Sequence, residues 1–285
     1  MKIKKKLKQK KDILFICINY YNEDDTQKFV YDLIKQKKSN LLHIIIVDNN
    51  GNEVSDHRLH NLSKMDSRIQ VFNPVDNLGY FGGAAWALKK YLFQSNIPEW
   101  IIISNTDISF ENTDFILNLL AMYPKEIEAI IAPSIISAKS GMDQNPYMTK
   151  RPNKIRMLFR KFIFMYRYTS FIYTYLYTTK LKILSKIERK NSKATSKRIY
   201  APHGSFIIFN KMYFESGGSL NYEPFLFGEE VFIAETARSL GLHVKYEPLL
   251  SVLHQEHATT GKKNIMIRYQ REASSYCADT FFFSK

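Results

Sequence analysis

The chain has 285 residues, of which 45% are hydrophobic, so it can form one large domain with a buried core, and this composition excludes intrinsic disorder. Two cysteines, Cys17 and Cys277, are too few for a disulfide framework and favour a reducing compartment. The formal net charge of +14 is concentrated in residues 2–11, with seven basic residues, and in residues 150–198, with 15 basic residues and one acidic residue, which excludes a uniformly basic fold.

Short apolar runs alternate with helical periodicity from Asp12 to Pro133. The pattern predicts strands at 13–18, 42–47, 69–72, 100–104 and 129–136, with helices at 26–37, 82–93 and 113–122. Strands and helices that alternate at this spacing form βαβ units. We therefore predict an α/β fold with a mainly parallel sheet flanked by helices.

The second half of the chain is less regular. Residues 150–198 interleave basic and aromatic residues, which predicts a helical insertion. Further on, the sequence predicts sheet structure at 199–209, a helix at 211–216, a helix at 229–240 that Gly241 ends, strands at 243–246 and 251–253, and an amphipathic helix at 264–283. No apolar run is long enough to span a membrane or to act as a signal peptide, so we predict a cytoplasmic protein.

Polar clusters follow the first two predicted strands. Asn19-Tyr20-Tyr21-Asn22 follows the first strand and Asp48-Asn49-Asn50-Gly51 follows the second. Ligands of open α/β sheets bind outside the carboxyl ends of the strands, so these side chains could hydrogen-bond a base and a ribose. The same residue types are also ordinary in turns and helix caps, and both interpretations stay open.

A glycine-containing loop, Asn77-Leu78-Gly79-Tyr80-Phe81-Gly82-Gly83, leads into a predicted helix. Glycines before a helix allow backbone amides to approach a phosphate, but they also allow a helix to pack closely on a sheet. The spacing differs from the GxGxxG pattern, which disfavours a dinucleotide site.

The strand at 100–104 ends in Asn105-Thr106-Asp107, which places an amide oxygen and a carboxylate two residues apart. Mg²⁺ and Mn²⁺ prefer oxygen ligands and commonly combine one or two carboxylates with substrate phosphates. The sequence therefore predicts a metal-bound diphosphate at this strand end, with a helix cap as the alternative.

Two further groups lie downstream. Glu229 and Glu230 are adjacent at a predicted helix start, where the helix dipole alone favours acidic residues, although one carboxylate in apolar surroundings could also act as a base. His254 and His257 flank Glu256, and such a pair is weak evidence for a metal site.

The order of these motifs resembles that of the family 2 glycosyltransferases with the GT-A fold, particularly the bacterial rhamnosyl- and galactosyltransferase-like members that build surface polysaccharides. The segments that carry the resemblance are, in chain order, IVDNN, NLGYFGG, SNTD, GSFIIF, FLFGEE, SLG, YEP and VLH. The resemblance covers roughly residues 12–135 and 199–260, and it implies a nucleotide-sugar-binding half at 12–149 and an acceptor-binding and catalytic half at 199–260. The charge and periodicity of the sequence add a basic tail at 1–11, the insertion at 150–198, which lies outside the resemblance, and a C-terminal helix at 261–285.

The resemblance also implies roles for individual residues. Glu230, or its neighbour Glu229, would be the catalytic base, and Asp107 with His254 would hold Mg²⁺ or Mn²⁺. Gly204 and Ser205 would bind the acceptor, and donor binding would fall to Asn19, Tyr20, Asp48, Asn77, Gly79, Asn105 and Asp107. The chain departs from the family pattern at Asn105, Glu230 and Phe232, where relatives carry aspartates, so the choice between the two glutamates stays open.

The implied reaction is an inverting transfer of a hexose from a UDP- or dTDP-sugar to a saccharide hydroxyl in capsule, O-antigen or other cell-surface polysaccharide synthesis. The acceptor would be linked to a polyprenyl diphosphate, and residues 150–198 would contact an anionic membrane, so the protein would lie peripherally on its inner face. One alternative is a basic nucleic-acid-binding protein, but the sequence contains no recognisable RNA- or DNA-binding motif, so no nucleic acid is expected as a partner. A second alternative is a sugar nucleotidyltransferase, which would need a basic glycine-rich loop directly after the first strand.

Overall fold

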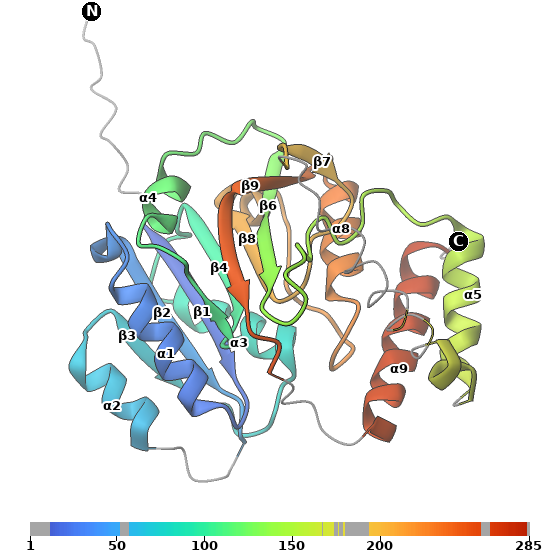
Figure 1. Cartoon of the computed structure of the whole chain (residues 1–285), viewed down its shortest axis with the longest axis horizontal. Coiled ribbons are helices and arrows are strands. Elements are labelled where there is room, and N and C mark those ends of the chain that lie inside the picture. The colour runs from blue at the N-terminus through green and yellow to red at the C-terminus, as the bar shows by residue number, and fades with distance from the viewer. Residues whose placement is uncertain are drawn as a thin grey trace, which may run out of the picture.

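The computed structural model describes residues 12–51, 57–166, 168–173, 176, 179, 194–257 and 263–283. Their core is one mixed sheet with helices on both faces (Figure 1). The strands run in the order β3 (Ile69–Phe72), β2 (Leu42–Asp48), β1 (Ile13–Asn19), β4 (Trp100–Asn105), β8 (Phe206–Asn210), β6 (Glu128–Ser137), β9 (His243–His254) and β5 (Ile108–Ser109), and β7 (Lys197–Ile199) pairs with β9.

Alternating side chains of β1 divide the core into two layers. Ile13, Phe15 and Cys17 face one side of the sheet, where α1 (Glu23–Ile34), α2 (His57–Met65) and α4 (Phe115–Leu120) cover them. Leu14 and Ile16 face the other side, under α3 (Tyr80–Leu92), α7 (Lys211–Glu215) and α8 (Glu229–Ser239). A sheet covered on both faces explains why its strands are continuous apolar runs.

The first half of the sheet is parallel, as the sequence predicts, because β1 pairs in parallel with both β2 and β4, and β2 with β3. The second half adds antiparallel pairs: β8 runs antiparallel to β4 and to β6, whereas β6 and β9 are parallel. The α/β prediction is confirmed, and the sheet as a whole is mixed.

Two predicted boundaries are wrong. Residues 199–209 form not one element but β7 and β8, separated by a loop that contains Pro202 and Gly204. The predicted strands at 243–246 and 251–253 are one strand, β9, which bulges where Pro133 pairs with Glu247 and Ser134 with Ser251. Pro248 lies in the bulge and has no N–H to donate, so the sequence pattern breaks although the strand continues. The helix α2 and the two-residue strand β5 were not predicted.

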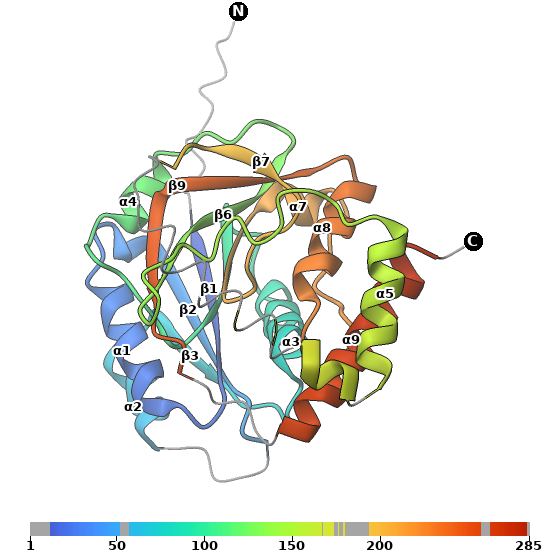
Figure 2. The same ribbon diagram turned by 45° about the vertical axis from the view of Figure 1, so that its right-hand side comes forward.

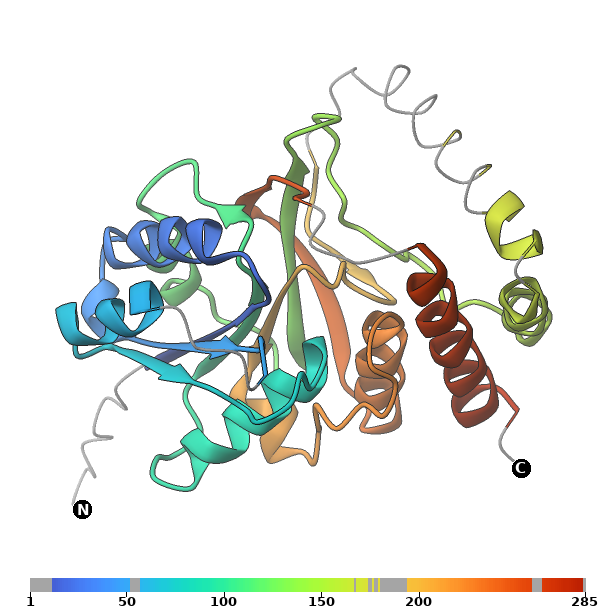
Figure 3. The same ribbon diagram turned by 90° about the horizontal axis from the view of Figure 1, so that it is seen from below.

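The basic insertion begins with α5 (Lys154–Met165), which Asn153 caps by accepting the N–H of Arg156. Residues 168–173 are helical as well, and much of the remaining insertion lies outside the described residues, as does the predicted tail at 1–11. The C-terminal helix is confirmed as α9 (Lys263–Phe281), and it lies beside α5 (Figures 2 and 3). Within the described residues, the helices are too short or too polar to cross a bilayer.

Candidate active site

The carboxyl ends of three strands meet because of the sheet register. Asn19 at the end of β1 pairs with Asp48 of β2, and Ile18 pairs with Asn105 of β4. A cavity of about 400 Å³ opens beside these ends. Ten residues of the predicted site line it, namely Tyr20, Asn77, Gly79, Asn105, Asp107, Gly204, Ser205, Glu229, Glu230 and His254.

Asn19 and Asp48 lie behind the cavity wall rather than in it. Asp48 is buried, and its two carboxylate oxygens accept amide hydrogen bonds from Asn19 Nδ2 at 3.0 Å and Asn73 Nδ2 at 3.1 Å. Thr26 Oγ1 donates to Asn19 Oδ1 at 2.8 Å. This network fixes the ends of β1 and β2. Of the three donor-binding residues predicted at these two strand ends, Tyr20 lines the cavity.

The loop before α3 is held by Asn49, a residue of the polar cluster after the second strand that was not among the predicted donor-binding residues. Asn49 Nδ2 donates to Asn77 Oδ1 at 2.7 Å and to the carbonyl oxygen of Gly79 at 2.9 Å, and its Oδ1 accepts the N–H of Leu78. Gly79 has a φ of +73°, and a Cβ there would lie 2.2 Å from the carbonyl oxygen of Phe225. Close packing therefore requires this glycine, and the loop also borders the cavity.

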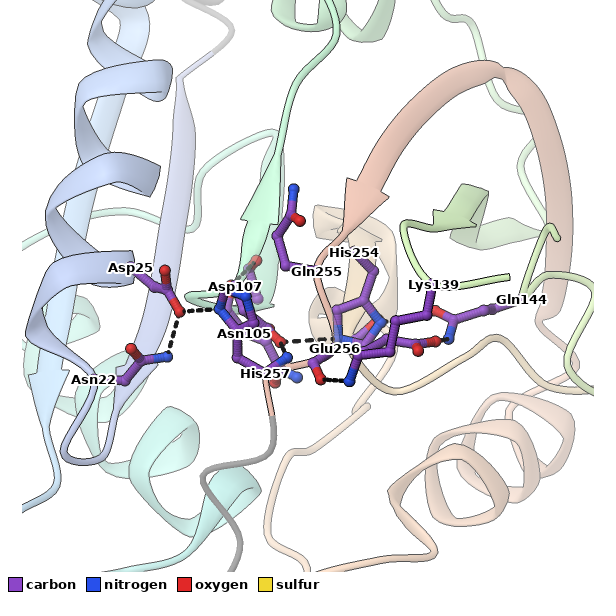
Figure 4. A network of polar contacts seen from close by, with 12 residues as sticks. Asn22, Asp25, Asn105, Asp107, Lys139, Gln144, His254, Gln255, Glu256 and His257 are labelled. Atoms are coloured by element: carbon purple, nitrogen blue, oxygen red, sulfur yellow. Dashed lines mark hydrogen bonds and ion pairs between the residues drawn. The ribbon is translucent and has the colours of Figure 1, made fainter. Parts of the chain in front are cut away.

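Asp107 and His254 are brought together by the pairing of β5 with β9. Ile108 lies opposite His254, so His254 Nε2 is 3.3 Å from Asp107 Oδ2 (Figure 4). On its other side, His254 Nδ1 lies 2.8 Å from Gln144 Oε1. Gln144 Nε2 donates to Glu256 Oε1 at 2.5 Å, and because a carboxylate can accept but not donate, the amide oxygen of Gln144 must face the histidine.

These contacts fit a divalent cation. Because the amide oxygen of Gln144 can only accept, Nδ1 of His254 donates to it, and Nε2 is the ring nitrogen that faces the Asp107 carboxylate. A cation between Nε2 and the carboxylate would suit this pair. Among the described residues, no group of three or more His, Cys, Asp or Glu side chains could enclose a metal ion. Asp107 and His254 therefore fit a cation whose remaining ligands are phosphates and water.

His257 also lines this cavity, although its side chain is exposed and the sequence gave only weak evidence for a site at this histidine. Its backbone N–H donates to Asp107 Oδ2 at 2.9 Å, and its Nδ1 lies 2.5 Å from Asp25 Oδ2. Burial raises the pKa of Asp25, but hydrogen bonds from His257 and Asn22 outweigh burial and hold that pKa below its usual value. The chain after β9 thus connects Asp107 to α1, a contact that local sequence does not reveal.

Glu229 and Glu230 begin α8 and line the same cavity. Burial and the adjacent Glu230 carboxylate raise the pKa of Glu229, which is 5% exposed. Burial also raises the pKa of Glu230, although its own N–H, the Arg160 guanidinium and the N–H of Gly204 favour its ionised form. Glu230 is more exposed than Glu229, and neighbouring groups favour its ionised form. Of the two carboxylates, Glu230 is therefore the better candidate for a proton acceptor.

The loop at 203–205 sits directly against Glu230. A Cβ on Gly204 would lie 2.8 Å from Glu230 Oε1, and the Tyr80 hydroxyl donates to the Gly204 carbonyl oxygen at 3.0 Å. The N–H of Ser205 donates to His203 Nδ1 at 3.2 Å, which fixes the ring of a cavity residue that sequence reasoning missed. Desolvation and the neighbouring His254 lower the pKa of His203 to about 4, so His203 is neutral.

Solved structures with this architecture are GT-A glycosyltransferases. They include a mannosyltransferase from Pyrobaculum calidifontis in complex with GDP-Man and Mn²⁺, with a TM-score of 0.53, 12% identity, and coverage of 96% of this chain and 64% of that one. GalNAc-T7 with UDP, GalNAc and Mn²⁺ gives a TM-score of 0.57 and 12% identity over 88% of this chain and 45% of that one. TarS of S. aureus gives a TM-score of 0.53 and 13% identity, with coverage of 86% of this chain and 36% of that one. This chain thus spans less than two thirds of each, and at these identities the likeness shows the fold.

The sequence itself matches the family model described as glycosyl transferase family 2 over residues 15–216. The chain belongs to that family. A comparison with curated protein sequences finds no match.

Proposed function

We propose that this protein is an inverting glycosyltransferase that moves a hexose from a UDP- or dTDP-sugar to a hydroxyl group of a saccharide acceptor. The observation that carries the proposal is one cavity lined both by the Asp107–His254 pair and by the Glu229–Glu230 pair. A cation-binding pair and a carboxylate base in one cavity suit the two halves of a sugar transfer. Membership of family 2 supports the same reaction class.

In the proposed mechanism, Glu230 takes the proton from the acceptor hydroxyl as that oxygen attacks the anomeric carbon and the bond to the nucleoside diphosphate breaks. The N–H of Gly204 and the charge of Arg160 favour the ionised form that a base needs. Glu229, whose pKa burial and Glu230 raise, remains protonated beside it. A cation at Asp107 and His254, Mg²⁺ or Mn²⁺, would offset the negative charge that develops on the departing diphosphate.

The remaining residues position the donor. Tyr20, Asn77, Gly79 and Asn105 border the cavity on the donor side, while Asn19 and Asp48 set the shape of the strand ends from behind. His257 lines the same cavity, and its backbone N–H donates to Asp107 Oδ2. Positioning of this kind accounts for much of the rate gain in a single displacement.

We further propose that the acceptor belongs to capsule, O-antigen or other cell-surface polysaccharide synthesis, is linked to a polyprenyl diphosphate, and is met by a cytoplasmic protein at the inner face of the membrane. This proposal rests on the resemblance and on the basic insertion at 150–198.

The test is a product analysis with purified protein, Mn²⁺, a panel of UDP- and dTDP-sugars and saccharide acceptors. We expect release of a nucleoside diphosphate and a glycoside of inverted anomeric configuration. Release of pyrophosphate would identify a nucleotidyltransferase instead, and a retained configuration would refute the single displacement.

A further inference from the structure

The outward face of α5 is an exposed apolar stripe. It consists of Ile155, Leu158, Phe159, Phe162 and Tyr166, whose spacing of three and four residues places them on one side of the helix. Ile155 is 77% exposed and Phe159 is 64% exposed. The helical residues that follow α5 also expose apolar side chains, namely Tyr168, Phe171, Ile172 and Leu176. Apolar surface of this extent marks an interaction site.

The stripe is not left over from incomplete packing, because the opposite face of α5 already has a partner. Met157 and Phe164 are buried there, and Lys161 Nζ forms an ion pair with Asp279 Oδ1 of α9 at 2.7 Å. The helix is therefore anchored to the domain by one face. The second face is available to another partner.

The charge around the stripe indicates what that partner is. Lys154 and Arg156 lie about 100° to either side of Ile155, and both are exposed with no ion-pair partner among the described residues. The whole segment 150–198 carries 15 basic residues and one acidic residue. A second copy of the chain would set two strongly basic segments against each other, whereas an anionic bilayer satisfies both the charge and the apolar stripe.

We propose that the α5 stripe docks on the surface of an anionic phospholipid membrane, with Phe159 and Phe162 in the headgroup region. Amphipathic helices rich in Lys, Arg and aromatic residues bind in this way without crossing the bilayer. Within the described residues, no helix could cross it.

The docked surface would lie one helix away from the cavity. α5 packs on α9 (Figure 2), and Ile265, Met266 and Tyr269 of α9 line the cavity. Arg160 of α5 and Glu230 line a small gap among α5, α8 and α9. If the proposed function holds, this arrangement brings the proposed base close to a membrane in which a lipid-linked acceptor resides.

Vesicle flotation tests the proposal without any glycosyl transfer, so its failure and the failure of the proposed function are distinguishable. We expect the full chain to float with phosphatidylcholine vesicles that contain phosphatidylglycerol, and to bind vesicles of phosphatidylcholine alone at least tenfold more weakly. Raised salt should weaken binding because screening acts on the basic side chains.

One variant of the stripe, one variant of the basic residues that flank it and one control make the test specific. The double variant Phe159→Glu with Phe162→Glu should lower vesicle binding at least tenfold, and Lys154→Glu with Arg156→Glu should remove the preference for anionic lipid. The control is Phe93→Glu, which makes the same change at an 89% exposed phenylalanine directly after α3. All three changes alter exposed side chains, and a thermal melt checks that each variant is folded.

Two results would overturn the proposal. One is equal flotation of the wild type and the Phe159→Glu, Phe162→Glu variant. The other is a wild-type dimer in solution that the same double change dissociates while vesicles bind neither protein, which would assign the stripe to a second copy of the chain.

Discussion

Oε1 of Gln144 lies 2.8 Å from Nδ1 of His254, and this contact determines which ring nitrogen carries the proton. Glu256 accepts the amide N–H of Gln144 and so orients its oxygen toward the ring. Nε2 of His254 is therefore free to act as a ligand beside Asp107.

Replacing Gln144 should weaken metal binding. Gln144→Leu removes the hydrogen-bond acceptor that fixes the histidine tautomer, and we expect the Mn²⁺ concentration at half-maximal activity to rise about 10- to 100-fold. The control is Gln255→Leu, because Gln255 follows His254 directly but its side chain donates to Ser109 instead. An unchanged Mn²⁺ requirement in Gln144→Leu would show that this contact does not tune the site.

Glu230→Gln should abolish sugar transfer while the donor still binds. The substitution keeps the shape of the side chain but removes the group that accepts the proton, and loss of a general base typically costs about 10²- to 10⁴-fold in rate. Steady-state rates and donor titration measure the two effects separately. Glu229→Gln is the matched variant, and we expect a smaller loss because burial and the Glu230 carboxylate raise the pKa of Glu229 and disfavour the ionised form that a base needs. The opposite order of effects would make Glu229 the base.

Gly204→Ala should lower turnover without weakening donor binding. The added methyl group would lie 2.8 Å from Glu230 Oε1, so the carboxylate must move, and we expect the rate to fall about tenfold or more. Gly82→Ala is the control, because its Cβ would meet only Leu78 Cβ at 3.4 Å within a helix. Equal turnover of Gly204→Ala and the wild type would mean that Glu230 is not held where the reaction needs it.

Glu235 should stabilise the fold at neutral pH. Its side chain is 1% exposed and accepts hydrogen bonds from Arg151, Tyr200 and Arg238. Burial raises the pKa of Glu235, but these partners outweigh it and hold that pKa below the usual value. We expect Glu235→Gln to lower the free energy of unfolding by about 2 kcal/mol at pH 7.

The pH dependence of this effect has a defined sign. A carboxyl group with a depressed pKa stabilises the fold above its unfolded-state pKa of about 4.3, and this stabilisation disappears as the pH falls through the folded-state value. Urea unfolding should therefore give a difference between the wild type and Glu235→Gln that shrinks below about pH 4. Glu215→Gln, at an exposed position of α7, should change little at any pH. A difference that grows in acid would contradict the account.

Much of the fold follows from local sequence, because buried parallel strands are recognisable apolar runs and their polar ends mark a ligand edge. The strand end therefore predicted Asp107 as a site residue and the family resemblance implied Glu230, and both residues line the cavity. It could not place His257 or His203, because their roles depend on contacts with Asp25, Asp107 and Ser205 that are set by tertiary structure. The strand β5 has two residues, too few for a periodic signal, and yet its pairing with β9 brings His254 to Asp107.

The central claim is that Asp107, with a divalent cation, holds a nucleotide-sugar diphosphate. Thermal unfolding with a panel of UDP-, dTDP- and GDP-sugars, with and without Mn²⁺, tests it most directly, because a ligand that binds the folded state alone raises its stability. We predict that a UDP- or dTDP-sugar raises the melting temperature by several degrees when Mn²⁺ is present, and that EDTA or Asp107→Asn removes the rise. The claim is contradicted if no sugar nucleotide stabilises the protein, or if the same rise persists in EDTA and in Asp107→Asn.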